Sequence, residues 1–374
     1  MTVPECFDPA TTDQWRYLAT TNRKLESLAI AAVADLVGVD ATVEYPGMIG
    51  FAADQSAVAE LNRCSRSLHR LLLELARTPV QSLDDITDAV RELDVPAYLG
   101  PDQSFGVRAR RRGEHPFDSM DVERAVGQAI IDQYRAQDGT RPPVDLDNPD
   151  VIFRLIVREE QARITIDTTG RQSLHRRWYR VREHEAPLRP TIAHAMLQLA
   201  EYDPTTRLVD PTCGFGTIPI EAALLARGRS PTADRDRPHT RLRFLNQTDK
   251  DTADCAAGPT GDPAVVAADV DPDAVAGARE NARAAEVAKD LAFAQADARH
   301  PPFDGDALVA DMPYGVRTTG EIRPLYAAIS ETIAAGDWER VVLLTAREDL
   351  LDPAPTRSIP ILRGRLEASI LVFD

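Results

Sequence analysis

The sequence predicts an α/β protein of several domains, in which a parallel sheet in the C-terminal half follows two smaller α+β units. The chain has 374 residues, which is too long for a single hydrophobic core. An apolar run, Leu208 to Asp210, ends in a carboxylate and precedes a glycine turn and an Ala-rich helix from Thr217. A second apolar run ends in the same way at Asp311. Strands that end in acids beside a glycine turn are typical of parallel sheets that bind nucleotide-like ligands.

Residues 1–77 are expected to form a ferredoxin-like unit with the order β-α-β-β-α-β. Pro46 and Gly47 mark the turn of its hairpin. No residue here carries chemistry, so the unit is either a spacer that positions the next domain or a folding scaffold. Apolar periodicity predicts strands at 15–21, 42–45 and 48–52, helices at 23–36 and 55–63, and a strand or helix at 68–75.

Residues 78–180 are expected to form a second α+β unit. Its first strand starts at Phe105 and alternates apolar and basic residues, which places Arg108 and Arg110 on one face. Ser119 is expected to cap a helix that runs to Tyr134. The other expected elements are a helix at 83–93 and strands at 151–157 and 162–166.

The charge distribution distinguishes this second unit from the rest. Between Ser104 and Arg182 there are 15 Arg and 12 acidic residues, a local charge of +3, whereas the whole chain carries −16. That contrast is expected of a surface that faces RNA, although Arg clusters are more often solvated faces. Only Lys24, Lys250 and Lys289 are lysines. Abundant acids with few lysines favour a halophile-like, salt-adapted protein.

Residues 181–374 are expected to form the domain with the parallel sheet. Pro187 and Pro190 introduce its first helix. Residues 228–263 are rich in Pro, Asp, Arg, Thr and Gly, so a mobile surface insertion is expected, with RNA contact through Arg235, Arg237, Arg241 and Arg243 as the weaker alternative. The other expected elements are strands at 265–269, 291–297, 308–311 and 341–345, helices at 191–200, 217–227, 271–285 and 322–333, and a C-terminal antiparallel hairpin at the sheet edge.

The glycine turn after Asp210 predicts a ligand site. Gly214 and Gly216 allow positive φ and close approach of the backbone, and the helix that follows has free amide donors. A plain structural turn is the alternative. Asp271 with Pro272 reads as a helix cap, which leaves Asp269 at the strand tip to accept hydrogen bonds from ribose hydroxyls.

The sequence Asp311-Met312-Pro313-Tyr314 is suited to methylating an exocyclic amine of a base. Such a nitrogen is a poor nucleophile because its lone pair is delocalised into the ring. The Asp311 carboxylate and the Met312 carbonyl can accept its hydrogens and direct its lone pair at a sulfonium methyl. Tyr314 would stack on the base, which is worth roughly 1–3 kcal/mol, and Pro313 would stiffen the loop. A simple Asp-Pro turn at a strand end is the alternative.

Taken together, these motifs resemble those of class I, Rossmann-like S-adenosylmethionine-dependent methyltransferases. With the upstream residues, the chain resembles THUMP-domain RNA guanine-N2 methyltransferases, and most closely the archaeal and eukaryotic type that acts on guanosine 6 of tRNA. It departs from the family at Met312, where many relatives carry Pro. Besides the two motifs, the resemblance rests on residues 104–113, 144–150, 169–180 and 186–191.

The resemblance implies a site made of three groups of residues. The catalytic group is Asp311, Met312, Pro313 and Tyr314. The cofactor, S-adenosyl-L-methionine, is expected to contact Leu188, Thr191, Asp210, Cys213, Gly214, Gly216, Thr217, Asp269, Val270, Asp297, Ala298 and Asp311, with a helix cap as the alternative role of Asp297. The acceptor stem of tRNA is expected to contact Arg108, Arg110, Arg111, Arg112, His175, Arg176, Arg177, Arg180 and Arg317.

Several other functions remain as alternatives. They are guanine-N2 methylation at another tRNA or rRNA site, adenine-N6 methylation, and RNA binding without catalysis. Cys6, Cys64, Cys213 and Cys255 are scattered, so neither a zinc site nor a disulfide framework is expected. No apolar run of 18 residues or signal segment occurs, which predicts a cytoplasmic protein. We expect it to act as a monomer.

Overall fold

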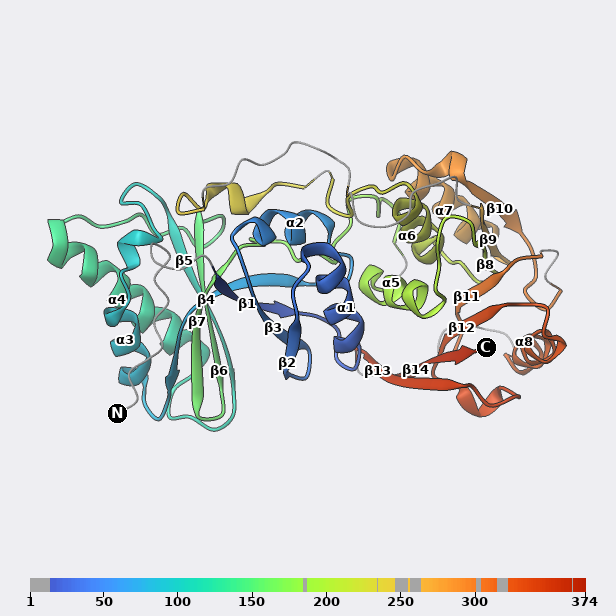
Figure 1. Ribbon diagram of the computed structural model, residues 1–374, viewed down its shortest axis with the longest axis horizontal. Coiled ribbons are helices and arrows are strands. Elements are labelled where there is room, and N and C mark those ends of the chain that lie inside the picture. The colour runs from blue at the N-terminus through green and yellow to red at the C-terminus, as the bar shows by residue number, and fades with distance from the viewer. Residues whose placement is uncertain are drawn as a thin grey trace.

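The protein is described by a computed structural model that covers residues 14–183, 187–233, 235–245, 255, 264–300, 304–314, 322–364 and 366–374. These residues form two seven-stranded sheets that lie side by side along an elongated molecule (Figure 1). The first sheet belongs to the N-terminal half of the chain and the second to the C-terminal half. The mixed α/β fold class expected from the sequence is confirmed.

The first sheet has the strand order β2-β3-β1-β4-β7-β6-β5. Its first four strands, together with two helices, have the expected β-α-β-β-α-β order. Residues 68–75, which were expected to form either a strand or a helix, contribute to strand β4. The elements are β1 (Trp15–Thr20), α1 (Glu26–Val37), β2 (Ala41–Tyr45), β3 (Met48–Ala53), α2 (Ser56–Cys64), β4 (Arg70–Pro79), α3 (Leu83–Glu92), β5 (Phe105–Arg112), α4 (Ser119–Asp138), β6 (Val151–Arg158) and β7 (Gln161–Asp167).

Strand β4 joins the two N-terminal units into one sheet. One of its edges pairs with β1, with Leu73 opposite Tyr17, and the other edge pairs with β7, with Leu73 opposite Ile166. Its ten residues are mostly buried. A single core cluster therefore extends from Trp15 to Ile166 across both units. The sequence identified the elements of each unit, but it did not indicate that they share a sheet.

Helices α3 and α4 pack against each other, with α3 on β4 and α4 on β5 (Figure 1). The cap of α4 differs from the expectation by one residue. Asp118, not Ser119, is the N-cap, because its carboxylate accepts from the Asp121 amide while the Asp121 side chain accepts from the Asp118 amide. Such a reciprocal pair satisfies two amide donors that the first helical turn leaves without partners.

The second sheet has the order β10-β9-β8-β11-β12-β14-β13, in which β14 runs antiparallel to β12 and forms an antiparallel edge hairpin with β13. The chain order reverses between β8 and β11, which is the switch point where such sheets bind ligands. The elements are α5 (Pro190–Leu199), β8 (Arg207–Asp210), α6 (Thr217–Ala226), β9 (Ala264–Asp269), α7 (Pro272–Ala284), β10 (Leu291–Gln295), β11 (Ala307–Asp311), α8 (Arg323–Ala335), β12 (Arg340–Thr345), β13 (Arg357–Arg363) and β14 (Leu366–Phe373). Short 3-10 turns occur at Val95–Ala97, Pro238–Arg241, Ala288–Asp290 and Glu348–Leu350.

The first part of the expected insertion packs against the N-terminal half instead of extending into solvent. Residues 235–245 lie over the first sheet (Figure 1). Leu242 and Leu245 join its core, and the Phe244 ring stacks on Trp15 with 6.0 Å between centroids. Burial of these apolar side chains holds the segment in place. The expectation of a mobile insertion is therefore wrong for 235–245, whereas 246–254 and 256–263 lie outside the described residues.

A disulfide between Cys64 and Cys255 also differs from the expectation. The two cysteines are separated by 191 residues in the sequence. They meet because the insertion returns to the end of α2, where the Cys255 amide donates to the Gly228 carbonyl. No spacing pattern in the sequence indicates such a long-range pair. Within the described ranges, no helix is both long and apolar enough to cross a bilayer, and no group of three metal-ligating side chains occurs.

Candidate active site

The glycine turn lies between the ends of β9 and β11, because β8 pairs in parallel with both strands. The Gly214 amide donates to the Asp269 carboxylate at 2.9 Å, and the Thr212 hydroxyl donates to the Asp311 carbonyl at 3.2 Å. Asp210 is buried and accepts from the Thr212 amide at 3.2 Å. The structure thus brings together the three strand-end acids that the sequence placed far apart.

The two glycines have different roles. Gly216 has a φ of +82°, and a Cβ there would lie 3.0 Å from the Ala278 Cβ, so this glycine permits close packing of α6 on α7. Gly214 has a φ of +51°, and a Cβ there would meet no atom within 4 Å. The backbone at Gly214 therefore faces open space at the carboxyl edge, where a ligand can approach closely.

The electrostatics of this edge favour a cation. Burial raises the pKa of Asp210 well above its usual value, and the negative charges of Asp269 and Asp311 add to that effect. Burial also raises the pKa of Asp269, although hydrogen bonds from the Asp271 and Gly214 amides oppose it. Acids that raise one another's pKa are stabilised by a positive charge placed among them. The arrangement fits the sulfonium and ammonium groups of S-adenosylmethionine.

The next residues at the edge combine an exposed apolar side chain with a helix cap. Val270 follows Asp269 and is 64% exposed, which is unusual for a large apolar side chain. Asp271 caps α7 by accepting from the Asp273 amide at 2.9 Å, as expected, so Asp269 is the acid available at the strand tip. Cys213 is buried, and its amide donates to the Ala268 carbonyl.

Asp297 has a partner that the sequence did not suggest. The Arg299 Nε donates to both carboxylate oxygens of Asp297, at 3.0 and 2.9 Å. These hydrogen bonds and the positive charge lower the pKa of Asp297 to about 2. Asp297 begins a turn and does not cap a helix, while the neighbouring Ala298 is buried.

The side chains of the Asp311 to Tyr314 segment contact one another and Arg363. The Tyr314 hydroxyl and the Arg363 guanidinium both donate to the Asp311 carboxylate. Arg363 Nη1 lies 2.8 Å from Oδ1 and 2.7 Å from Oδ2. The loop is held from the other side by Tyr326, whose hydroxyl donates to the Pro313 carbonyl at 3.0 Å, while the buried Met312 donates its amide to Leu344. Burial raises the pKa of Asp311, and the Arg363 charge opposes that rise.

The linker before α5 is tied to the glycine turn. Arg180, expected at the RNA surface, donates to the Leu188 carbonyl and, at 3.1 Å, to the Thr217 hydroxyl. Leu188 is buried next to this contact. Thr191 points elsewhere, since its hydroxyl accepts from Asn22 at 2.9 Å in the N-terminal half. The structure thus does not support a cofactor contact by the Thr191 hydroxyl.

Arg177, also expected at the RNA surface, has a fully buried side chain. It pairs with Glu221 on α6 at 2.8 Å, and Glu221 also accepts from the Tyr179 hydroxyl and from Arg66 of the N-terminal half. Burial raises the pKa of Glu221, but the charges and hydrogen bonds of these partners outweigh it and lower the pKa to about 2. This buried network joins the two halves of the molecule.

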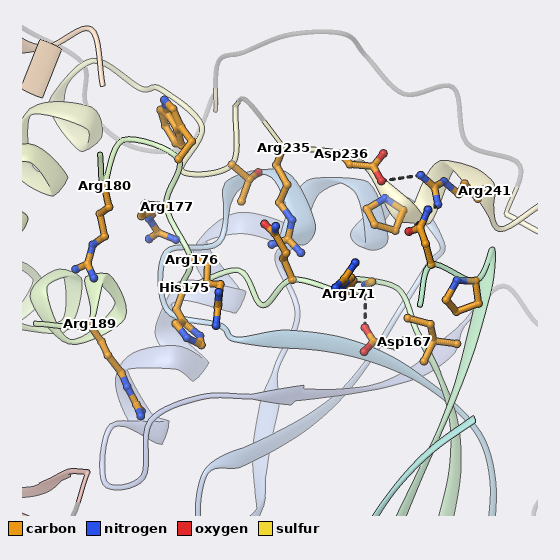
Figure 2. A pocket seen from close by; sticks show the side chains of 18 of the residues that line it. Asp167, Arg171, His175, Arg176, Arg177, Arg180, Arg189, Arg235, Asp236 and Arg241 are labelled. Atoms are coloured by element: carbon orange, nitrogen blue, oxygen red, sulfur yellow. Dashed lines mark hydrogen bonds and ion pairs between the residues drawn. The ribbon is translucent and has the colours of Figure 1, made fainter. Parts of the chain in front are cut away.

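A basic groove of about 810 Å³ runs between the two halves. Figure 2 shows Arg235 reaching from the insertion toward the side of the groove where Arg171 and Arg176 lie. Arg235 Nη1 and Arg180 Nε have no hydrogen-bond partner among the described residues. Burial and the nearby charge of Arg70 lower the pKa of Arg235 to about 10. A half-enclosed groove lined by several arginine side chains is suited to phosphate.

The expected RNA contacts on β5, Arg108, Arg110, Arg111 and Arg112, lie apart from this groove. Arg110 and Arg112 are exposed near the end of β5, where Arg112 is opposite Arg158. The groove is at the start of the same strands, so the two places are separated by roughly 20 Å of strand length. Arg108 and Arg111 donate to main-chain carbonyls, His175 and Arg176 line the groove, and Arg317 lies outside the described residues.

Sequence reasoning missed two charged residues of this region. Glu221 carries a usable signal, because it is the one charged residue within the otherwise apolar helix α6 and such a residue is buried only when it is paired. Arg363 has no comparable signal in the sequence. It lies on the edge hairpin, 52 residues after Asp311, and nothing in its local sequence indicates which acid it meets.

Comparisons with known proteins agree with this architecture. A family model described as an RMKL-like methyltransferase domain matches residues 177–359, and a THUMP domain model matches residues 80–167. The crystal structure of TrmN from Thermus thermophilus is 31% identical, with a TM-score of 0.71 over 96% of this chain and 98% of that chain.

Two archaeal relatives match over most of their length. The chain is 36% identical over 341 residues to a tRNA (guanine(6)-N2)-methyltransferase from Archaeoglobus fulgidus, which covers 88% of this chain and 83% of that protein. It is 31% identical over 353 residues to the enzyme of the same name from Methanocaldococcus jannaschii, and this match covers 90% of this chain and 92% of that protein. The resemblance inferred from the motifs is thereby confirmed. The chain belongs to the family of THUMP-domain RNA methyltransferases that includes these tRNA (guanine(6)-N2)-methyltransferases.

Proposed function

We propose that this methyltransferase methylates the exocyclic N2 amine of a guanosine in tRNA, and that the target is guanosine 6 of the acceptor stem. The observation that carries the proposal is the contact between Thr212 and Asp311, which places the amine-orienting loop beside the glycine turn. Both archaeal relatives are named for this reaction. Their identity to this chain over most of its length supports the same substrate.

S-adenosylmethionine supplies the electrophilic methyl group when it is bound. Gly214 would let the donor approach the backbone, and Asp269 would accept hydrogen bonds from its ribose. Asp210 and its neighbouring acids would favour its positive charge. Val270 and Ala298 would border the adenine ring, and Asp297 would reach its amino group after releasing Arg299.

Residues of the chain itself prepare the nucleophile. Asp311 and the Met312 carbonyl accept the two amine hydrogens, which directs the nitrogen lone pair toward the methyl carbon. A nitrogen–carbon bond forms as the carbon–sulfur bond breaks, and its electron pair remains on sulfur. The nitrogen then loses one proton, for which the Asp311 carboxylate is the adjacent acceptor. Positioning two reactants in one site is worth about 7–11 kcal/mol in favourable cases.

The target guanosine would have to leave the helix, because Asp311 lies at the partly buried end of β11. Flipping a base costs a few kcal/mol. The basic groove would bind the RNA backbone and offset part of that cost. It connects the THUMP half with the glycine turn, since Arg180 lines the groove and also contacts Thr217. Recognition of phosphates in a groove, and not of base edges, fits the way proteins recognise duplex RNA by shape.

Methylation of a tRNA transcript tests this proposal. We expect purified protein with S-adenosylmethionine to produce N2-methylguanosine, identified by mass spectrometry of the nucleosides. A transcript with adenosine at position 6, its pairing partner exchanged, should not be methylated. Continued formation of N2-methylguanosine on that control would show that the modified guanosine is at another position. Formation of N6-methyladenosine would show that the target base is adenine and not guanine.

A further inference from the structure

Arg363 occupies the space in front of the catalytic carboxylate. It extends from the end of β13 and contacts both oxygens of Asp311 with one nitrogen, at 2.8 and 2.7 Å. Its guanidinium carbon also lies 5.4 Å from the centre of the Tyr314 ring. Arg363 therefore makes two interactions that the target base needs, namely donation to Asp311 and contact with the Tyr314 face.

The pair is accessible and is not part of the core. The side chains of Arg363 and Asp311 are 20% and 19% exposed. Within the described part of the chain, the other charged or titratable groups that face Asp311 are Asp210 on β8, Tyr314 on its own loop and Tyr326 on α8. Among the described residues, Arg363 supplies the positive charge that balances this carboxylate.

The chemistry of the guanidinium matches one base better than the others. In guanine, C2 is bonded to N1, N3 and the exocyclic N2, so this edge of the ring is itself a planar guanidine. Adenine presents an amidine at its amine. We propose that Arg363 is a positioning residue that holds Asp311 and Tyr314 in place as an internal substitute for the guanine edge, and that it withdraws when the base enters. This inference rests on the proposed guanine-N2 activity and deepens it.

When the base takes the place of Arg363, the surroundings of the Asp311 carboxylate change. The pKa of Asp311 therefore responds to Arg363 in the free enzyme but not in the RNA-bound enzyme. In the free enzyme, the positive charge of Arg363 opposes the rise that burial causes in the pKa of Asp311. In the complex, the base has taken its place, so Arg363 no longer acts on the carboxylate. The pH dependence of kcat/KM reports groups of the free enzyme, whereas that of kcat reports groups of the complex.

The test measures both pH profiles for the wild type and for Arg363→Ala, with the tRNA transcript as substrate. We expect the acid limb of kcat/KM to move to higher pH in Arg363→Ala while the acid limb of kcat stays in place. On the alkaline plateau, kcat/KM should rise roughly tenfold, because a charge-assisted competitor has been removed. A shift in both profiles would show that Arg363 stays on Asp311 in the complex, and a shift in neither would make the pair merely structural. Either result overturns the proposal.

Two further measurements separate this proposal from failure to fold and from failure of the assigned activity. Binding of S-adenosylmethionine by calorimetry should be unchanged in Arg363→Ala, and Arg347→Ala, an exposed arginine paired with Asp349, is the matched control. Guanidinium ion at non-denaturing concentration should inhibit Arg363→Ala competitively with tRNA and affect the wild type at least severalfold less. Equal inhibition of both proteins would contradict the substitute role. Absence of guanine methylation by the wild type would instead refute the proposed function.

Discussion

The hydroxyl of Thr212 donates to the main-chain carbonyl of Asp311 at 3.2 Å, although the two residues are 99 positions apart in sequence. This contact joins the turn that would hold the methyl donor to the loop that would hold the acceptor amine. Parallel pairing of β8 with β11 produces it, since the carboxyl ends of both strands meet at one sheet edge. The following predictions test what this arrangement implies.

Asp311→Asn should retain cofactor binding and lose activity. The amide keeps the size of the side chain but lacks the negative charge that holds the amine hydrogens and accepts the proton. We expect kcat to fall by about 10²–10³-fold, as for the loss of one electrostatic partner of a transition state. Single-turnover methylation and calorimetric titration with S-adenosylmethionine measure the two properties. Asp349→Asn, which alters an exposed acid, serves as the control, and undiminished turnover by Asp311→Asn would remove this residue from the mechanism.

Arg171→Ala and Arg176→Ala should weaken tRNA binding without affecting the fold, since both side chains are exposed in the groove. Each lost phosphate contact should reduce the slope of log K against log salt by about 0.9. Filter binding of tRNA at a series of salt concentrations measures this slope. Arg243→Ala, which alters an insertion residue paired with Asp102 outside the groove, is the matched control. If Arg112→Ala has the larger effect, the RNA follows the exposed end of β5 instead.

Glu221→Gln should destabilise the protein by about 3–5 kcal/mol, because it leaves Arg177 and Arg66 buried without their counter-charge. Chemical denaturation measures the free energy of unfolding. Glu280→Gln, which removes a half-exposed pair with Arg182, should change it by less than about 1 kcal/mol. Equal effects of the two substitutions would contradict a special role for the buried network.

The same network should make stability depend on acid pH. The pKa of Glu221 is about 2 in the folded protein and lies near 4.3 in an unfolded chain. A lowered folded-state pKa stabilises the protein fully above about pH 4.3, and this stabilisation is lost as pH falls toward 2. Thermal melting between pH 5 and 2 should therefore show a decline in the wild type that is reduced in Glu221→Gln.

Salt should stabilise the protein. The chain has a net charge of −16, so its negative groups repel one another in the compact state. Dissolved ions screen this repulsion, with a screening length of about 10 Å at 0.1 M salt and about 3 Å at 1 M. We expect the midpoint of thermal unfolding to rise steadily with KCl concentration, with partial unfolding in dilute buffer. Full stability at low ionic strength would exclude the proposed adaptation to salt.

Local patterns in the sequence were sufficient to predict most elements and the two chemical motifs. Apolar periodicity located the strands, the glycines located the turn, and the acid at the end of a buried strand located Asp311. These signals are local because a strand, a cap or a turn depends on a few neighbouring residues. They also sufficed to predict the family that the comparisons confirmed.

Tertiary structure alone decided which distant side chains meet. Arg363 on Asp311, Arg177 on Glu221, Cys64 with Cys255, and Phe244 on Trp15 all join segments that are far apart in sequence. Each charge, thiol or ring has many possible partners in the chain, and its own neighbourhood does not distinguish among them. The partner is selected when sheet pairing and core burial bring two segments together. That is why Arg177 was expected to bind RNA and instead pairs with a buried acid.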